Sequence, residues 1–214
     1  MKLGNILILG DSYSTFEGCI PKGYAPYYTY KTERNTDVLA PKDTWWYQLE
    51  DENECKIILN NSWSGSTVCH TGYGGTDTSK TSSFNHRLDV LIREGFFIEN
   101  RIDTVLVFGG TNDSWASSPI GEMKNESITR EDEYAVLPAF SSLFAKLRSA
   151  APDARIVCII NCGLKDAITD GAHEICLYHR IEAIDLSDIE KIDGHPTKKG
   201  MSAIKDQIIA QLDK

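Results

Sequence analysis

Four polar residues with complementary chemistry each follow a separate apolar segment of the sequence. They are Ser12 after residues 5–9, Gly65 after residues 56–60, Asn112 after residues 104–108, and His195 beyond residues 181–186. A hydroxyl, an approachable backbone N–H, a side-chain amide and an imidazole are the groups that acyl transfer requires. The four positions therefore predict a nucleophile, a base and the donors that stabilise an oxyanion.

Each of these residues also has a simpler explanation when it is taken alone. An isolated Ser12 is best explained as a cap of the turn after a strand, and Gly65 as a turn glycine. Asn112 is about as readily a helix N-cap as a functional amide, and a single histidine is more often a surface or core residue. The convergence of all four positions favours the catalytic interpretation, with His195 as a base just before the final helix.

The apolar segments predict the elements that must position these residues. Short apolar runs bounded by turn residues are typical of strands buried on both faces of a parallel sheet. Five such runs are present, at residues 5–9, 56–60, 104–108, 155–160 and 181–186. Apolar periodicity and capping residues predict helices at 45–49, 83–94, 131–150 with a kink at Pro138, 165–180, and a closing helix marked by Met201, Ile204, Ile208 and Leu212.

Strands that alternate with helices predict an α/β fold with one parallel sheet covered by helices on both faces. The 214 residues contain no repeat or linker, so we expect a single domain over residues 1–214. In open parallel sheets, ligands bind beyond the carboxyl ends of the strands. Ser12, Gly65, Asn112 and His195 should therefore meet at one edge of the sheet.

Composition limits the classes of partner. The net charge of −9 argues against nucleic acid, which binds to basic surfaces. No apolar stretch is long enough to span a membrane. Met1-Lys2 leads almost directly into the first strand without room for a signal peptide, so a cytoplasmic location is expected, although a trimmed chain would look the same. The six cysteines form no Cys-x-x-Cys pair and are expected to be core thiols.

Two patterns that could bind a metal or a nucleotide do not fit those roles. His173-Glu174 followed by His179 has the wrong spacing for a zinc-binding helix, and Gly72, Gly74 and Gly75 do not follow a strand as a phosphate loop does. We therefore predict neither a metal site nor a nucleotide cofactor.

Four short motifs resemble the sequence blocks of the SGNH (GDSL-type) hydrolases, in the order of that family. Gly10-Asp11-Ser12-Tyr13-Ser14 resembles the first block, Asn60-Asn61-Ser62-Trp63-Ser64-Gly65 the second, Gly109-Gly110-Thr111-Asn112-Asp113 the third and Asp193-Gly194-His195-Pro196 the fifth. The resemblance spans residues 10 to 196. It implies a flavodoxin-like three-layer α/β/α sandwich with a five-stranded parallel sheet, and ester hydrolysis without a cofactor.

The same resemblance implies a role for each matching residue. Ser12 would be the nucleophile and His195 the base, and the oxyanion hole would consist of the Ser12 and Gly65 N–H groups with the Asn112 side chain. The family usually places its acid three residues before the histidine, where this sequence has Ile192. Asp193 is the candidate acid instead. A backbone carbonyl could orient the ring in its place, and Asp188 and Glu190 are more remote substitutes.

The expected activity is hydrolysis of a small O-acyl ester, with an acetylated sugar as the preferred substrate. Tyrosines of residues 13–30, with Trp63 and Trp115, form either a wall for that substrate or the packing of a long loop, and the sequence supports both equally. The sequence does not separate this substrate from a short-chain lipid ester or a thioester. Two alternatives to ester hydrolysis also remain open, namely an acyltransferase and a glycan-binding module without catalysis. The intact Ser, Gly, Asn and His set argues against the binding module.

Overall fold

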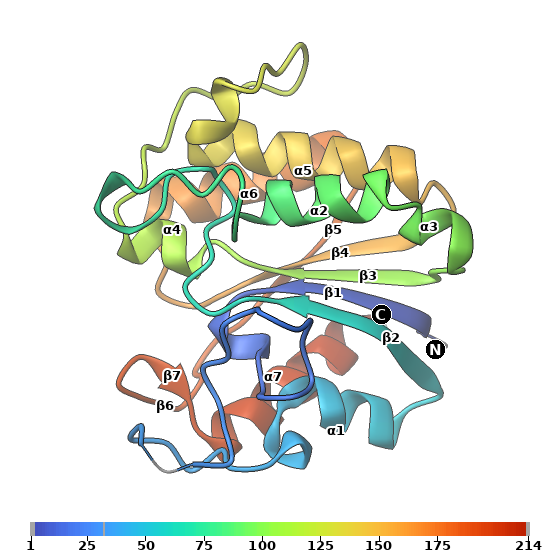
Figure 1. Ribbon diagram of the computed structural model, residues 1–214, viewed down its shortest axis with the longest axis vertical. Helices are drawn as coiled ribbons and strands as arrows, with labels where there is room; N and C mark the ends of the chain where they lie inside the picture. The colour runs from blue at the N-terminus through green and yellow to red at the C-terminus, as the bar shows by residue number, and fades with distance from the viewer. Residues whose placement is uncertain (1–2, 32, 213–214) are drawn as a thin grey trace.

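The protein is built around a parallel sheet of five strands (Figure 1). The computed structural model describes residues 3–31 and 33–212. The strands are β1 (Gly4–Gly10), β2 (Cys55–Ser62), β3 (Thr104–Phe108), β4 (Arg155–Ile160) and β5 (Glu182–Asp185). Their order in the sheet is β2-β1-β3-β4-β5, and every pairing is parallel. This order is the flavodoxin-like one, and it confirms the predicted fold class.

Helices cover both faces of the sheet, as Figure 1 shows. One layer contains α2 (Phe84–Arg93), α5 (Val136–Ala150) and α6 (Asp166–His179), and the opposite layer contains α1 (Trp45–Glu52) and α7 (Lys198–Leu212). Shorter elements connect them, namely η1 (Ser12–Ser14), η2 (Pro41–Asp43), η3 (Tyr73–Gly75), α3 (Phe96–Glu99), α4 (Thr111–Trp115), η4 (Asp132–Tyr134), β6 (Lys191–Ile192) and β7 (His195–Pro196).

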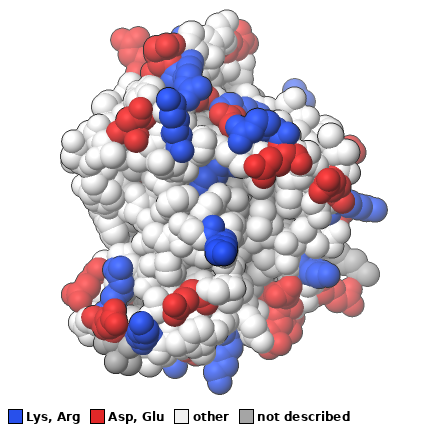
Figure 2. Space-filling model, in the orientation of Figure 1, with Lys and Arg blue, Asp and Glu red and all other residues white. Residues whose placement is uncertain are grey.

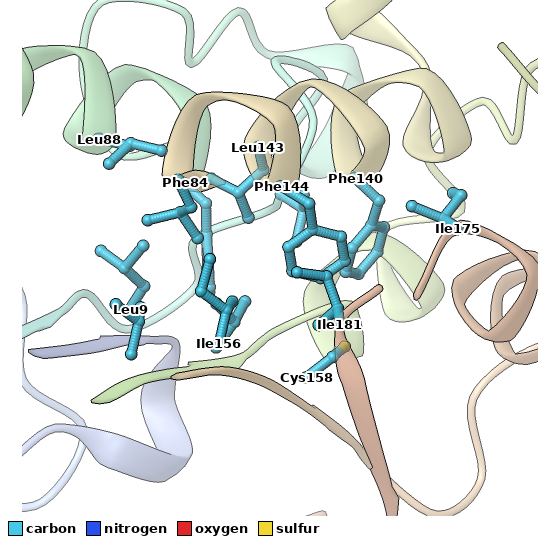
Figure 3. Close-up of a cluster of buried hydrophobic side chains, with 14 of the residues drawn as sticks. Leu9, Phe84, Leu88, Phe140, Leu143, Phe144, Ile156, Cys158, Ile175 and Ile181 are labelled. Atoms are coloured by element: carbon cyan, nitrogen blue, oxygen red, sulfur yellow. The ribbon is translucent and has the colours of Figure 1, made fainter. Parts of the chain in front are cut away.

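The alternation of side chains along each strand divides the core into two clusters. Leu7 and Leu9 of β1 pack toward α2, α5 and α6, whereas Ile6 and Ile8 pack toward α1 and α7. Figure 3 shows part of the first cluster, in which phenylalanines of α5 lie over β4. Successive residues of a strand point to opposite faces, so an unbroken apolar run is the pattern that a sheet covered on both sides requires.

One predicted helix is shorter than expected. The prediction of a helix over 131–150 with a kink at Pro138 is wrong, because α5 begins at Val136 after the separate turn η4. Pro138 is the third residue of α5. The first N–H groups of a helix have no intrahelical acceptor, so a proline is tolerated there without a kink. Here the proline marks the start of the helix.

Three further features concern the surface and the chemistry of the chain. Among the described residues, no helix is long and apolar enough to cross a membrane. The six cysteines, all of them in the described part, are free thiols, and Cys69, Cys158 and Cys176 are buried. Figure 2 shows acidic and basic side chains interspersed over the face that it presents.

The carboxyl ends of the strands lie together at one edge of the sheet, on the left of Figure 1, where α4 and the β6–β7 hairpin are also found. All four predicted residues lie in segments that follow these strand ends.

Candidate active site

Ser12 lies directly beyond β1, in a turn that tolerates little change. A Cβ atom on Gly10 would lie 2.5 Å from the Ser62 hydroxyl and 2.7 Å from the Ser14 Cβ. These two side chains therefore leave room only for glycine at position 10. Asp11 then caps η1, since its Oδ1 accepts a hydrogen bond from the Tyr13 N–H at 3.0 Å. The turn holds the nearly buried Ser12 as the first residue of η1.

His195 contacts Ser12 from the far end of the sequence. Its Nε2 lies 3.0 Å from the Ser12 Oγ, and its Nδ1 lies 3.2 Å from the backbone carbonyl oxygen of Asp193. A carbonyl oxygen can only accept, so Nδ1 carries the proton of the neutral ring and the Nε2 lone pair faces Ser12. This is the tautomer in which a histidine can accept a proton from a serine.

Of the candidate acids, Asp193 lies in the β6–β7 hairpin, whereas Asp188 and Glu190 precede it. In the described part of the chain, the His195 ring nitrogens contact the Asp193 carbonyl and the Ser12 hydroxyl, and neither of these groups is a carboxylate. The Asp193 carboxylate accepts from the Asn35 amide at 3.1 Å, and the Asp193 backbone has a positive φ of 48°. Glu190 accepts from Thr197 at 2.7 Å, on the side of α7. Ile192 pairs with His195 across the hairpin.

Three tyrosines of the long loop after Ser12 hold the histidine segment in place. The Tyr13 hydroxyl donates to the Gly194 carbonyl, and the Tyr28 hydroxyl donates to the Pro196 carbonyl at 2.9 Å. The Tyr27 ring stacks on the imidazole of His195, with 3.4 Å between centroids and 7° between planes. For these three residues, the packing interpretation of the tyrosine-rich segment is correct.

Other aromatic side chains, in the segments after β1, β2 and β3, are partly exposed. Trp115 is 43% exposed and meets the His195 ring edge-on, with 5.6 Å between centroids. Tyr24 and Trp63 form a tilted pair with 4.4 Å between centroids. The Tyr27 ring therefore supports His195, and the Trp115 ring forms partly exposed surface beside it.

The environment of His195 favours the neutral ring. Burial lowers the pKa of His195 to about 4, and the positive charges of Arg34 and Lys191 act in the same direction. Arg34 lies over the outer face of Tyr27, 4.4 Å from the ring centroid, so guanidinium, phenol and imidazole form one stack. The Asp193 carbonyl and carboxylate oppose the shift.

Gly65, in the loop after β2, and Asn112, in α4, lie in segments that hydrogen-bond to each other. Gly65 follows β2 with a φ of 81°, and the space around its missing Cβ is open. Asn112 is the second residue of α4, and its Nδ2 donates to the carbonyl of Ser66 at 3.0 Å. The amide is thus joined to the residue directly after Gly65. The neighbouring Asp113 carboxylate accepts from the backbone N–H groups of Val68 and Cys69, which fixes the same loop to α4.

Arg87 is an important residue that the sequence analysis missed. Its guanidinium is buried and donates to the carbonyl of Gly10 at 3.1 Å, to the carbonyl and side chain of Asn61, and to the Ser66 hydroxyl at 3.2 Å. Burial lowers its pKa to about 10, so it stays charged at neutral pH. The sequence feature that could have indicated Arg87 is its position on the apolar face of the helix, between Phe84 and Leu91.

The histidines outside the hairpin have separate partners. His173 contacts Asp185 at 2.9 Å, and His179 contacts Ser141 at 2.7 Å. Within residues 3–31 and 33–212, no group of three His, Cys, Asp or Glu side chains is arranged to hold a metal ion. The pattern at 173–179 therefore corresponds to ordinary helix-surface contacts.

Comparisons with known proteins agree with this architecture. The sequence matches the GDSL-like lipase/acylhydrolase family over residues 4–212. A Bacteroides ovatus protein assigned to the GDSL-like lipases is 39% identical, with a TM-score of 0.92 over 100% of this chain and 99% of that one. Its Bacteroides uniformis counterpart is 41% identical, with a TM-score of 0.90 over 98% and 95% of the two chains.

A family two carbohydrate esterase from Clostridium thermocellum, solved in complex with cellohexaose, shares the fold at 15% identity, with a TM-score of 0.66 over 100% of this chain and 65% of that one. No curated protein sequence matches the chain. The fold and the family match place the protein in the class of ester hydrolases. The chain belongs to the GDSL-like lipase/acylhydrolase family, which confirms the resemblance that the four motifs carry.

Replacing Arg87 tests its part in holding the site. Arg87→Met would remove the guanidinium donor from the oxygens of Gly10, Asn61 and Ser66, of which the Gly10 carbonyl keeps the Trp63 N–H. Breaking such a buried charged network costs about 3–5 kcal/mol of unfolding free energy. Urea denaturation measures this loss. Arg93→Met, at an exposed position on the same helix, is the matched control and should change stability by less than about 0.5 kcal/mol. Equal losses in the two variants would contradict the role of Arg87.

Proposed function

We propose that the protein is a serine esterase that hydrolyses short acyl esters, with acetylated carbohydrate as the preferred substrate, through an acyl-enzyme intermediate. The observation that carries the proposal is the 3.0 Å contact between the Ser12 Oγ and the His195 Nε2. A serine hydroxyl is a weak nucleophile at its own pKa and requires a base within hydrogen-bond reach. Ser12 and His195 meet that requirement.

In the proposed reaction, the Ser12 Oγ attacks the ester carbonyl while its proton passes to the His195 Nε2. The imidazolium then returns the proton to the leaving alcohol, and water hydrolyses the acyl-serine in a second round with the same base. The Asp193 carbonyl keeps the Nδ1 proton in place through both rounds. Asp193 thus serves the reaction through its main chain.

The proposed oxyanion hole consists of the backbone N–H groups of Ser12 and Gly65 and the side-chain amide of Asn112. The left-handed conformation of Gly65 and the open space at its Cα favour close approach of a substrate oxygen. Removing one oxyanion donor typically lowers turnover roughly 100- to 1000-fold. Asn112 contributes one of three donors, so its loss leaves measurable activity.

Two observations support a carbohydrate ester as the substrate. Exposed aromatic surface borders the Ser12–His195 pair at Trp115, and Tyr24 and Trp63 form a second aromatic pair on the loops that carry Ser12 and Gly65. Flat aromatic faces suit the apolar faces of sugars. In addition, a neighbour of the same fold is a carbohydrate esterase that was solved with cellohexaose bound.

Turnover of p-nitrophenyl esters from acetate to octanoate tests the proposal. Wild type should hydrolyse the short esters, and Ser12→Ala and His195→Ala should lose at least about 1000-fold in turnover, because both proton transfer and attack depend on this pair. Circular dichroism should show that both variants remain folded. Substantial hydrolysis by purified Ser12→Ala would refute the assignment of the nucleophile.

The alternatives give different outcomes in the same system. A fluorophosphonate should label Ser12 covalently in wild type, whereas a glycan-binding module without catalysis would not be labelled. An acyltransferase would be labelled equally, so product analysis with a sugar acceptor present separates transfer of the acyl group from its release to water.

The part of Asp193 in catalysis is tested at its side chain. Asp193→Asn removes the negative charge while keeping a residue that tolerates the observed φ of 48°. Turnover should fall less than about tenfold, because the ring contacts the carbonyl and not the carboxylate. Asp188→Asn, at another exposed position with positive φ, is the control. A loss of roughly 10,000-fold, as when a triad acid is neutralised, would assign the role to the carboxylate.

The lowered pKa of His195 predicts an acid-tolerant enzyme. The base must be neutral to accept the Ser12 proton, so kcat/KM should stay level from about pH 8 to pH 5 and fall through a midpoint near the pKa of about 4. Arg34→Gln removes a positive charge near the ring, which raises the pKa of His195 and moves the midpoint upward. A wild-type midpoint near 6.5, the usual value for histidine, would contradict this prediction.

A further inference from the structure

A tyrosine outside all four sequence motifs contacts the amide of Asn112. The Tyr73 hydroxyl lies 2.8 Å from the Asn112 Oδ1. Asn112 is 2% exposed, whereas the Tyr73 side chain is 46% exposed. The phenol ring therefore extends from the solvent-exposed surface to a buried amide beside the Ser12–His195 pair.

The partners of the amide determine which way it faces. The Ser66 carbonyl can only accept, so the amide group that lies 3.0 Å from it is the NH₂. The Oδ1 atom then faces the Tyr73 hydroxyl, which donates to it. One N–H of Asn112 is used on Ser66, and the other remains for a substrate oxygen. A flipped amide would turn Oδ1 toward Ser66 and toward any oxyanion, and both contacts would be repulsive.

The segment around Tyr73 is a closed turn that fixes the position of the hydroxyl. Thr71 and Asp77 pair across its base, and the Gly72 N–H donates to the Thr76 carbonyl at 2.8 Å. Gly74 and Gly75 have φ values of 64° and 77°, which glycine adopts without strain. The turn thus presents its tyrosine to Asn112 from an element that is separate from the strand ends.

We propose that Tyr73 is a positioning residue that orients the Asn112 amide as an oxyanion donor. The inference rests on the proposed function, because the amide must serve an oxyanion. The hydroxyl supplies no charge to the substrate and acts through Asn112. Its removal therefore lowers the rate of the chemical step and leaves substrate binding nearly unchanged.

Tyr73→Phe removes the hydroxyl and keeps the ring. We expect kcat for a short p-nitrophenyl ester to fall roughly 10-fold or more, with KM within about twofold, since loss of an entire oxyanion donor costs roughly 100- to 1000-fold. Each kcat is expressed per Ser12 that a fluorophosphonate can label, so a partly unfolded sample does not imitate the effect. Tyr73→Leu should show the same loss of kcat. A loss confined to Tyr73→Leu would assign the role to the ring and overturn the inference.

A double-mutant cycle with Asn112→Ala gives the decisive measurement. Without the amide, the hydroxyl has nothing to orient, so adding Tyr73→Phe to Asn112→Ala should change kcat by less than about twofold. If the two substitutions instead lower kcat by factors that multiply in the double variant, Tyr73 acts independently of Asn112. Tyr134→Phe is the matched control, because it removes a 3.2 Å hydrogen bond to Ser79 in the same loop and leaves Asn112 untouched. Its kcat should equal that of wild type.

Failure of this inference differs from failure of the proposed function. A wild type that neither hydrolyses esters nor is labelled at Ser12 refutes the function, and the inference with it. A wild type that is active and labelled, with Tyr73→Phe within twofold of it in kcat, refutes the inference alone.

Discussion

The guanidinium of Arg87 is buried between the carboxyl ends of β1 and β2, where it donates to oxygens of Gly10, Asn61 and Ser66. Gly10 is the last residue of β1, Asn61 is the last but one of β2, and Ser66 lies in the loop after β2. Burying a charge is costly, and it is tolerated only when every donor finds an acceptor. The hydrogen bonds of Arg87 therefore hold the turn with Ser12 and the loop after Gly65 at a fixed separation.

The sequence predicted the parts of this protein that follow from local chemistry. Buried parallel strands are unbroken apolar runs, so the apolar pattern alone assigns the residues after them to one edge of the sheet. Contacts between distant segments leave no such pattern. The stack of Tyr27 on His195, the hydrogen bond of Tyr73 to Asn112 and the carbonyl contact at Asp193 each depend on a turn whose backbone angles the residue types alone do not determine.

The histidine shows how a base can be oriented without a carboxylate on its ring. A backbone carbonyl selects the tautomer as a carboxylate would, and a stacked phenol keeps the ring from rotating. The carbonyl also favours the imidazolium, because it accepts the hydrogen bond of the ring. Burial outweighs this effect, and Arg34 and Lys191 act in the same direction as burial, so the pKa of His195 is low.

The contact between Ser12 and His195 joins residues that are 183 positions apart. The supports of the histidine, Tyr13 and Tyr28, belong to a segment that leaves the ribosome well before the hairpin that they hold. A nascent chain can form the turn around Ser12 early, but the pair itself forms only when the hairpin docks on those tyrosines. Assembly of the pair therefore requires the hairpin to have docked, and it reports that segments 183 positions apart in the sequence have reached their native arrangement.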